Sequence, residues 1–257
     1  MLPRFCRPAQ FAPFQGMGRL EHRWLNMKTD EPLIVARELS RVYRMGGAEV
    51  VGVDSISLDI LAGELVVLKG NSGSGKSTLL ALLAGLDQPT HGQLQVAGHD
   101  LRQATPAQLT RYRRQVVGMV FQSFNLLPTL TVLENVALPA LLAGRSYPSV
   151  QHSARELLGW LGLDARHDHL PSQLSGGEMQ RTAIARALIN DPAIILADEP
   201  TGNLDTHNSH IVVELLVDLN RRQGRTVIIA THSSLADRHA TVEIRLQDGA
   251  IVSKIPE

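Results

Sequence analysis

The sequence predicts an α/β protein with a mainly parallel core sheet, an antiparallel β subdomain near its start and an inserted α-helical subdomain. Two short apolar runs, residues 193–197 and 226–230, flank a helical pattern at residues 211–219, which indicates a parallel sheet. Alternating strands come earlier in the chain, and a long helical stretch follows them. With 257 residues, the chain can form one large domain with a sizeable hydrophobic interior.

The first elements are strands followed by one helix. Ile56, Leu58 and Ile60 alternate with polar neighbours, as expected for a strand with one buried face. Residues 65–68 are continuously apolar and lead into a glycine-rich segment, and residues 78–84 favour a helix. The order is therefore strand, loop, helix.

Alternation and capping residues predict the next elements. Residues 94–96 alternate as a strand, and Thr105 and Pro106 suit the N-cap and first position of a short helix ending near Arg114. Residues 116–121 return to a strand pattern.

The helical subdomain is expected over approximately residues 123–180. Between residues 130 and 171 the pattern is mostly helical, as at Leu157, Leu158 and Leu161, and lacks a convincing strand.

The last part of the chain returns to helix and strand. An apolar helical stripe covers residues 183–188. Residues 242–246 and 251–252 then flank Asp248 and Gly249, which predicts a hairpin with a type I′ turn.

Composition disfavours several classes of protein. Lys and Arg together number 25, as do Asp and Glu, so no net charge attracts nucleic acid or anionic lipid, and we expect no nucleic-acid partner. The single cysteine, Cys6, has no partner for an intramolecular disulfide, which fits a reducing compartment. No apolar run approaches the roughly 18 to 20 residues of a membrane span.

Residues 1–30 are expected to be a disordered extension before a domain at residues 31–257. The extension contains arginines but no continuous apolar region, so it is a poor secretory signal. We favour a disordered tail or an over-extended translation start, with Met27 beginning the natural chain. A basic tether to a membrane surface is the alternative.

Residues 70–77 carry the clearest chemical signal. They fit the pattern G-x-x-x-x-G-K-[ST] between a buried strand and a helix, where backbone N–H groups and the helix N-terminus bind phosphate. Lys76 is expected to neutralise the β- and γ-phosphates, and Ser77 to offer a hydroxyl to Mg²⁺. The nucleotide-binding residues predicted here are Gly70, Asn71, Ser72, Gly73, Ser74, Gly75, Lys76, Ser77 and Thr78.

Two carboxylates, Asp198 and Glu199, follow the apolar run at residues 193–197. Ligands of open α/β sheets bind at the carboxyl ends of the strands. We expect Asp198 to lie beside Mg²⁺ and Glu199 to polarise the attacking water, a role commonly worth about 10²- to 10⁴-fold in rate. Such a pair alone is often a solvated helix cap, but its combination with residues 70–77 favours catalysis.

Residues 174–181 predict a second helix start suited to an anion. Ser175, Gly176 and Gly177 precede an alanine-rich helix. Ser175 also suits an N-cap, with Glu178 as its capping-box partner. Capping alone would explain this segment, but two phosphate-binding helix starts far apart in one chain require a further explanation.

These segments resemble the motifs of ATP-binding cassette (ABC) proteins, in the same order, over about residues 34–252. Residues 174–181 are similar to the signature motif of that family, and residues 202–205 to its D-loop. The resemblance implies the P-loop NTPase fold of ABC ATPases and hydrolysis of ATP with Mg²⁺.

Three further residues receive roles from the resemblance. Gln122 corresponds to the glutamine that joins Mg²⁺ and senses the membrane subunit, and His232 to the histidine that contacts the γ-phosphate. Tyr43 resembles the aromatic residue that stacks on adenine. Taken singly, each could be an ordinary core or surface residue. The implied catalytic residues are Glu199, His232 and Lys76, and the implied Mg²⁺ ligands are Ser77, Gln122 and Asp198.

The resemblance also explains the second helix start. In ABC proteins the signature motif of one subunit faces the phosphate loop of another, which implies a head-to-tail dimer around two ATP molecules. Ser175, Gly176 and Gly177 would act in trans, with ATP closing the dimer and hydrolysis releasing it. The implied partners are a second copy and a transmembrane permease, at the cytoplasmic face of the inner membrane, to which the protein would attach peripherally.

Four segments resemble one branch of the family, which performs lipoprotein release or macrolide export. They are residues 85–90, 121–128, 131–136 and 197–205. Met179 and Ser233 depart from the usual pattern of the branch without removing a phosphate ligand or the base. A related cell-division ATPase, FtsE, is an alternative.

Other functions fit less well. A soluble ABC ATPase acting on DNA or ribosomes would be expected to carry long coiled coils, zinc-binding cysteines or tandem cassettes. A P-loop kinase or GTPase would leave residues 174–181 unexplained. A regulatory cassette without turnover is disfavoured by the presence of both Glu199 and His232.

Overall fold

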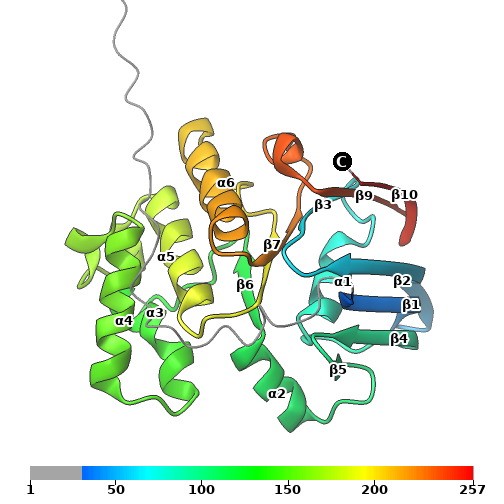
Figure 1. The fold of residues 1–257 in the computed structure, drawn as a ribbon, viewed down its shortest axis with the longest axis horizontal. Coiled ribbons are helices and arrows are strands. Elements are labelled where there is room, and N and C mark those ends of the chain that lie inside the picture. The colour runs from blue at the N-terminus through cyan, green and yellow to red at the C-terminus, as the bar shows by residue number, and fades with distance from the viewer. Residues whose placement is uncertain (1–30, 257) are drawn as a thin grey trace, which may run out of the picture.

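Three helices between residues 132 and 188 gather at one end of the molecule, and an antiparallel sheet lies at the other (Figure 1). The computed structural model describes residues 31–256. The extension expected at residues 1–30, which contains Cys6 and Met27, lies outside the described residues. Its disorder therefore stays a prediction.

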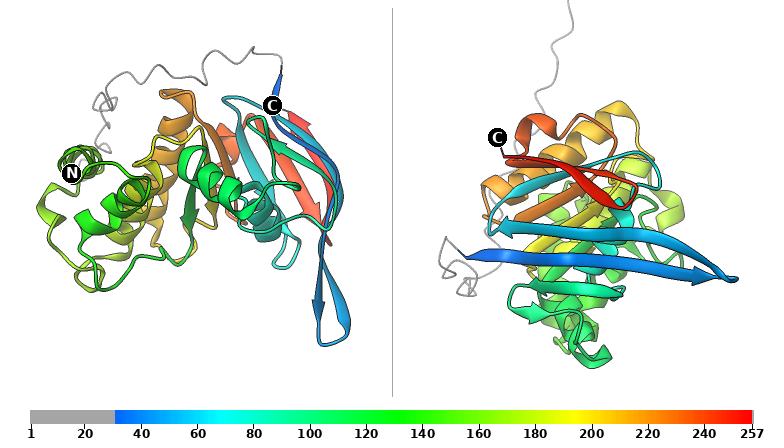
Figure 2. Two further views of the ribbon diagram at one scale, coloured as in Figure 1. Left: turned by 90° about the horizontal axis from the view of Figure 1, so that it is seen from below. Right: turned by 90° about the vertical axis from the view of Figure 1, so that its right-hand side faces the viewer.

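Four antiparallel strands form the first sheet, in the order β2-β1-β4-β5. They are β1 (Pro32–Met45), β2 (Ala48–Leu61), β4 (His91–Val96) and β5 (His99–Asp100). Strands β1 and β2 extend as a long hairpin across the molecule (Figure 2). Ile56, Leu58 and Ile60 are buried while their neighbours are more exposed, which confirms the predicted alternation.

Six strands form the second sheet, in the order β10-β9-β3-β8-β7-β6. They are β3 (Leu65–Lys69), β6 (Val117–Phe121), β7 (Ile194–Asp198), β8 (Thr226–Ala230), β9 (Val242–Gln247) and β10 (Ala250–Pro256). All neighbours pair in parallel except β10, which is antiparallel to β9. The prediction of a mainly parallel core sheet is confirmed.

The parallel register places the ends of three strands at the same level. Leu68 of β3 and Asp198 of β7 both lie opposite Ala230 of β8. Hydrogen bonding continues one residue further, because the Thr231 N–H donates to the Leu68 carbonyl (3.0 Å) and the Glu199 N–H to the Ala230 carbonyl (2.8 Å). The segments that follow β3, β7 and β8 therefore begin side by side.

Two hydrophobic cores lie on opposite faces of the second sheet. Along β3, Leu65 and Val67 join the core on the helical side, whereas Val66 and Leu68 join the core shared with the antiparallel sheet. Helix α1 (Lys76–Leu83) belongs to the second core through its leucines. Only residues 70–75 separate β3 from α1, and both elements are anchored in the core shared with the antiparallel sheet. The two ends of this loop are therefore held in place.

The remaining helices begin where the sequence provides caps. They are α2 (Pro106–Gln115), α3 (Val132–Leu142), α4 (Tyr147–Trp160), α5 (Gly176–Leu188) and α6 (Thr206–Arg221), with short 3₁₀ helices at Asp164–Arg166, Pro171–Gln173 and Asp237–His239. Thr105, Thr131 and Ser175 form capping boxes with the glutamine or glutamate three residues later. Helices α3 and α4 come after β6 and before α5 in the chain. Residues of α3, α4 and α5 all belong to the core on the helical side of the second sheet.

The hairpin between β9 and β10 turns at Asp248 and Gly249, with φ of 49° and 84°. Positive φ at both central residues confirms the predicted type I′ turn. The Gly249 N–H donates to the Ser74 carbonyl (3.1 Å), and its carbonyl accepts from the Asp54 N–H (2.9 Å). The turn thus joins the loop after β3 to strand β2.

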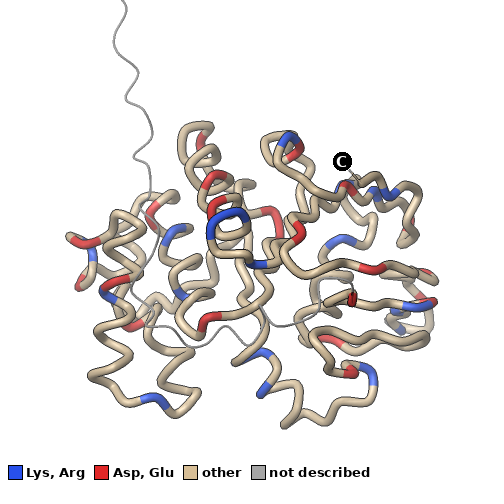
Figure 3. The backbone as a smooth tube through the Cα atoms, viewed as in Figure 1, with Lys and Arg blue, Asp and Glu red and all other residues tan. Residues whose placement is uncertain are grey.

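The surface carries charges of both signs. Figure 3 shows Lys and Arg interspersed with Asp and Glu along the elements at both ends of the molecule. Within residues 31–256, none of the helices is both long enough and apolar enough to cross a membrane.

Asn135, fully buried in the first turn of α3, ties the helix to the segment before it. Its side-chain amide donates to the carbonyls of Leu127 (3.1 Å), Leu130 (2.9 Å) and Thr131 (3.0 Å). Its side-chain oxygen accepts from the Leu127 N–H (2.8 Å). Removing it would leave the part-buried Leu127 N–H and Leu130 carbonyl without their partner.

We therefore expect Asn135→Ala to lower the free energy of unfolding by about 2–3 kcal/mol, because unsatisfied buried polar groups cost about 1–3 kcal/mol each. Urea unfolding followed by circular dichroism would measure it. Asn190→Ala is the matched control, since that amide makes a longer bond to the Pro139 carbonyl (3.3 Å) and should cost less than about 1 kcal/mol. Equal losses in the two variants would contradict the role of Asn135.

Candidate functional site

The loop at residues 70–77, here called the phosphate loop, joins β3 to α1, and its Ser74 and Lys76 side chains are buried. The Lys76 ammonium donates to the carbonyls of Gly70 (2.7 Å) and Asn71 (3.1 Å). Gly75, the N-cap of α1, has φ of 100° and gives the helix no side-chain cap. The buried Ser74 hydroxyl has no hydrogen-bond partner within residues 31–256. Free donors at a helix start and an unpaired buried hydroxyl both suit an anion.

Glycine is required in this loop where the backbone passes close to other strands. A Cβ on Gly70 would lie 2.4 Å from the Leu246 carbonyl oxygen of β9. A Cβ on Gly75 would lie 2.4 Å from the Gly52 carbonyl oxygen of β2. Both residues also have positive φ, so any side chain here would be strained as well as crowded.

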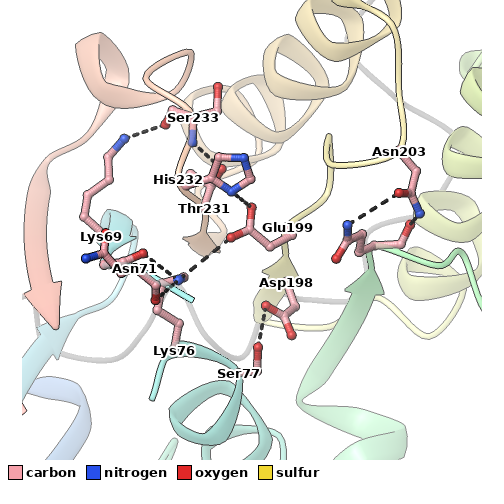
Figure 4. Close-up of polar contacts among 12 residues, drawn as sticks. Lys69, Asn71, Lys76, Ser77, Asp198, Glu199, Asn203, Thr231, His232 and Ser233 are labelled. Carbon is pink, nitrogen blue, oxygen red and sulfur yellow. Dashed lines mark hydrogen bonds and ion pairs between the residues drawn. The ribbon is translucent and has the colours of Figure 1, made fainter. Parts of the chain in front are cut away.

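Two carboxylates face this loop from the end of β7 (Figure 4). The Ser77 hydroxyl donates to Asp198 Oδ1 (3.1 Å). Glu199 Oε1 lies 3.9 Å from Lys76 Nζ, and Glu199 Oε2 lies 3.0 Å from His232 Nδ1. Glu199 thus stands between a cation on α1 and an imidazole after β8.

The backbone of Glu199 takes a conformation that L-residues rarely adopt, with φ of 45°. Its N–H is nevertheless bonded to the Ala230 carbonyl, which extends the pairing of β7 with β8. Backbone strain at a non-glycine residue costs about 1–3 kcal/mol and is concentrated at functional sites. The strained turn directs the Glu199 side chain back over the phosphate loop.

Burial raises the pKa of Asp198 above its ordinary value, and the nearby negative charge of Glu199 acts in the same direction. The hydrogen bond from Ser77 and the charge of Lys76 oppose this shift only in part. The ionised form of Asp198 is therefore less favoured, relative to the neutral form, than in an exposed aspartate.

Gln122, at the end of β6, meets Asn203 in the turn after β7. Gln122 Nε2 lies 3.4 Å from Asn203 Oδ1, and the Asn203 side-chain amide donates to the Gln122 carbonyl (3.1 Å). A Cβ on Gly202 would lie 2.7 Å from Gln122 Nε2. The two segments singled out in the sequence are therefore in contact.

A cavity of about 620 Å³ brings most of the predicted residues together. Its lining comprises Tyr43, Val50, Val51, Gly52, Asn71, Ser72, Gly73, Ser74, Gly75, Lys76, Ser77, Thr78, Gln122, Glu199 and His232. Ser175, Gly176 and Gly177 do not line it. The two predicted anion-binding helix starts thus do not share one cavity within the chain.

The start of α5 forms the predicted capping box. The Ser175 hydroxyl accepts from the Glu178 N–H (3.3 Å) and donates to Glu178 Oε2 (2.9 Å). A hydrogen bond from Arg166 and the bonds from Ser175 lower the pKa of Glu178 to about 2. A Cβ on Gly177 would lie 2.0 Å from Asn208 Oδ1 of α6, so close helix packing also requires this glycine.

Two polar residues of α5 connect it to the site: Gln180, which lies within the segment 174–181 indicated by the sequence, and Arg186, which the sequence did not single out. The fully buried Gln180 side chain donates to the Pro200 carbonyl (2.8 Å), one residue after Glu199. Arg186 donates to the carbonyls of Phe124 (2.8 Å) and of Asn125. An arginine between two alanines of this helix was the signal that could have identified Arg186.

Comparison with protein-family models matches residues 53–202 to the family described as ABC transporter. The chain belongs to the ABC transporter family. An uncharacterised ABC transporter ATP-binding protein of Mycobacterium tuberculosis is 45% identical over 225 residues, which cover 88% of this chain and 91% of the relative.

Two named relatives represent the branch that the sequence resembles. The lipoprotein-releasing system ATP-binding protein LolD of Chromohalobacter salexigens is 42% identical over 86% of this chain and 94% of its own. The macrolide export ATP-binding/permease protein MacB of Rhodopirellula baltica is 46% identical over 84% of this chain. This chain spans 32% of the length of that MacB.

Solved structures agree with the fold. The ATP-binding cassette MJ0796 in a dimeric post-hydrolysis state bound to ADP and Pi is 38% identical and superposes with a TM-score of 0.81, covering 87% of this chain and 98% of that one. A second dimeric structure of the same cassette is 40% identical, with the same TM-score. The ABC ATPase fold is confirmed, and the cassette is an ATP-binding and ATP-hydrolysing subunit.

The raised pKa of Asp198 leads to a prediction about stability. A carboxyl group whose folded-state pKa is raised contributes stability at low pH, and this contribution is lost as the pH rises through that pKa. Asp198→Asn keeps the acceptor for Ser77 and removes the charge, so we expect the free energy of unfolding at pH 7 to rise by about 0.5–2 kcal/mol. The gain should shrink as the pH is lowered through the pKa of Asp198.

Urea unfolding at a series of pH values from 7 down to about 4, the ordinary pKa of aspartate, would measure both effects. Asp59→Asn is the control, because that carboxylate pairs with Arg37 at the surface (2.7 Å) and its loss should bring no gain. A less stable Asp198→Asn variant at pH 7 would contradict the prediction.

Proposed function

We propose that this cassette binds ATP with Mg²⁺ between two copies of itself and uses hydrolysis to drive a membrane permease of the lipoprotein-release or macrolide-export type. The observation that carries the proposal is the position of Glu199 between Lys76 and His232 above the phosphate loop. A base, a cation and an imidazole on three different elements suit attack on a phosphoryl group.

The phosphate loop would bind the triphosphate through its backbone N–H groups, the start of α1 and the Ser74 hydroxyl. Lys76 would exchange its bonds to the Gly70 and Asn71 carbonyls for bonds to phosphate oxygens. Tyr43 lines the same cavity, where it would receive the adenine.

The residues present fit Mg²⁺. Ser77 and Asp198 are hydrogen-bonded to each other through the oxygens that would bind the ion, and Gln122 lines the same cavity as Ser77. Bound Mg²⁺ would neutralise charge on the β- and γ-phosphates. Its charge would also stabilise the ionised form of Asp198, which burial disfavours.

Glu199 would act as the general base for phosphoryl transfer to water. It accepts a proton as the water oxygen bonds to the γ-phosphorus, and the bond from that phosphorus to the bridging oxygen of ADP breaks. His232, with Nδ1 beside Glu199, can present its other ring nitrogen to the γ-phosphate. Lys76 stabilises the negative charge on the transferred group.

A second copy would complete the site. Ser175, Gly176 and Gly177 start α5 with backbone N–H groups suited to phosphate, yet they lie outside the cavity of their own chain. The dimeric structures of the similar cassette MJ0796 support a dimer here. ATP that binds only the closed arrangement would shift the equilibrium towards it.

A groove of about 340 Å³ is the proposed docking site for the permease, and binding there would hold the cassette peripherally at the cytoplasmic face of the membrane. Its lining comprises Ala84, Leu86, Arg113, Arg114, Val117, Gly118, Met119, Phe121, Asn125, Pro139, Arg186, Ala187 and Asn190. Three arginines and several apolar side chains suit a short helix with acidic groups, and none of the described residues lining the groove is acidic.

The groove is connected to the nucleotide site. Arg186, which lines it, bonds to Phe124 and Asn125, both at positive φ, two and three residues after Gln122. A partner that draws Arg186 away would release this strained segment and with it Gln122.

We expect Glu199→Gln to retain ATP binding, to accumulate an ATP-bound dimer and to lower turnover by about 100-fold or more, because the general base is removed. Phosphate release and size-exclusion chromatography with ATP would measure these effects. Glu243→Gln is the control, since Glu243 lies beside the loop but outside the cavity that contains Lys76, and it should keep wild-type turnover. Wild-type turnover in Glu199→Gln would remove the residue from this role.

Docking is tested by Arg114→Glu, which reverses a charge in the groove. We expect about tenfold less permease to be recovered by affinity purification from detergent-solubilised membranes, with the turnover of the isolated cassette unchanged. Arg111→Glu is the matched control, because Arg111 lies on the same helix but outside the groove. Recovery of ribosomes or DNA without a membrane protein would contradict the transport function.

A further inference from the structure

The Tyr43 side chain is held by residues that lie outside the nucleotide cavity. Its hydroxyl donates to Asp87 Oδ2 (2.9 Å), in the turn that follows α1. Arg41, two residues earlier on β1, binds the same carboxylate through Nε (2.8 Å to Oδ2) and Nη2 (2.8 Å to Oδ1). The Arg41 and Asp87 side chains are 26% and 23% exposed, so this pair is largely shielded from water.

Arg41 also covers one face of the tyrosine. Its guanidinium carbon lies 4.6 Å from the centroid of the Tyr43 ring, within the range of a cation–π interaction. Tyr43 lines the nucleotide cavity, whereas Arg41 and Asp87 do not. The guanidinium thus occupies one face of the ring, which leaves the opposite face for a base.

The ring edge is fixed as well. Strands β1 and β2 pair Arg41 with Val53 and Val42 with Val51, so Gly52 is an extra residue in β2. A Cβ on Gly52 would lie 2.8 Å from Tyr43 Cε2 and 2.9 Å from Thr78 Cγ2. The bulge at this glycine lets the tyrosine approach the first turn of α1.

We propose that Asp87 and Arg41 are positioning residues that fix the Tyr43 ring as a preorganised platform for the purine base of the nucleotide. The proposal rests on the proposed nucleotide site and deepens it. Asp87 holds the hydroxyl, Arg41 holds the back face, and the ring loses little freedom when a base stacks on it. Neither residue lines the cavity that contains the phosphate loop, so removing either should affect nucleotides with a purine and spare ligands without a base.

The test is calorimetric titration of the full chain with ATP and, separately, with inorganic tripolyphosphate. Asp87→Ala should raise the dissociation constant for ATP by about tenfold, since stacking on an aromatic side chain commonly contributes that much or more. The dissociation constant for tripolyphosphate should stay unchanged. The preference for ATP over CTP should also fall, because a loose ring distinguishes a purine from a smaller base less well.

Two further variants exclude a merely structural effect. Asp59→Ala removes a second Arg–Asp pair made by strand β1, with Arg37, and should change neither titration. Tyr43→Phe keeps the ring but loses the bond to Asp87, so it should weaken ATP binding about threefold. Combining Tyr43→Phe with Asp87→Ala should add little to Asp87→Ala alone, because both remove the same hydrogen bond.

The outcomes separate the two proposals. Unchanged ATP binding in Asp87→Ala, or equal weakening of ATP and tripolyphosphate, would overturn the platform. If Asp87→Ala does not fold, Tyr43→Phe alone decides, and unchanged ATP binding in it would also overturn the platform. A wild-type protein that binds neither ligand would instead overturn the nucleotide site itself.

Discussion

Everything at the nucleotide site depends on the parallel register of β3, β8 and β7. Leu68, Ala230 and Asp198 lie at one level, and backbone bonding continues through Thr231 and Glu199. Three polar segments therefore leave the sheet at neighbouring points: the phosphate loop, the acidic pair and the segment with His232. A shift by one residue in any strand would turn its side chains to the other core and separate these groups.

Much of this could be predicted from the sequence, because the signals are local. The apolar runs of β7 and β8, the caps at Thr105 and Ser175 and the turn at Asp248 each depend on residues close in the chain. Helix α6 is longer than its apolar pattern at residues 211–219 suggests, since Asp205 caps it by accepting from the Asn208 N–H (2.8 Å). That cap starts the helix before its buried face begins.

The remaining features could not be predicted, because they join segments far apart in the chain. The contact of Gln122 with Asn203 spans 81 residues, and that of Arg186 with Phe124 spans 62. The sequence indicates Gly177 as a phosphate-binding glycine. In the structure its close packing against Asn208 also requires glycine at this position. Such residues serve the fold and the site together, and a sequence pattern reveals only one of these uses.

The hydrogen bond from the Gly249 N–H to the Ser74 carbonyl connects the β9–β10 hairpin to the phosphate loop, although the two segments are far apart in the chain. The turn is hydrogen-bonded to the phosphate loop at Ser74 and to strand β2 at Asp54. Exchanging or lengthening this hairpin in an engineered chimera would change the shape of the loop without altering any residue of the loop. In this cassette the conformation of the phosphate loop is therefore tied to that of the hairpin.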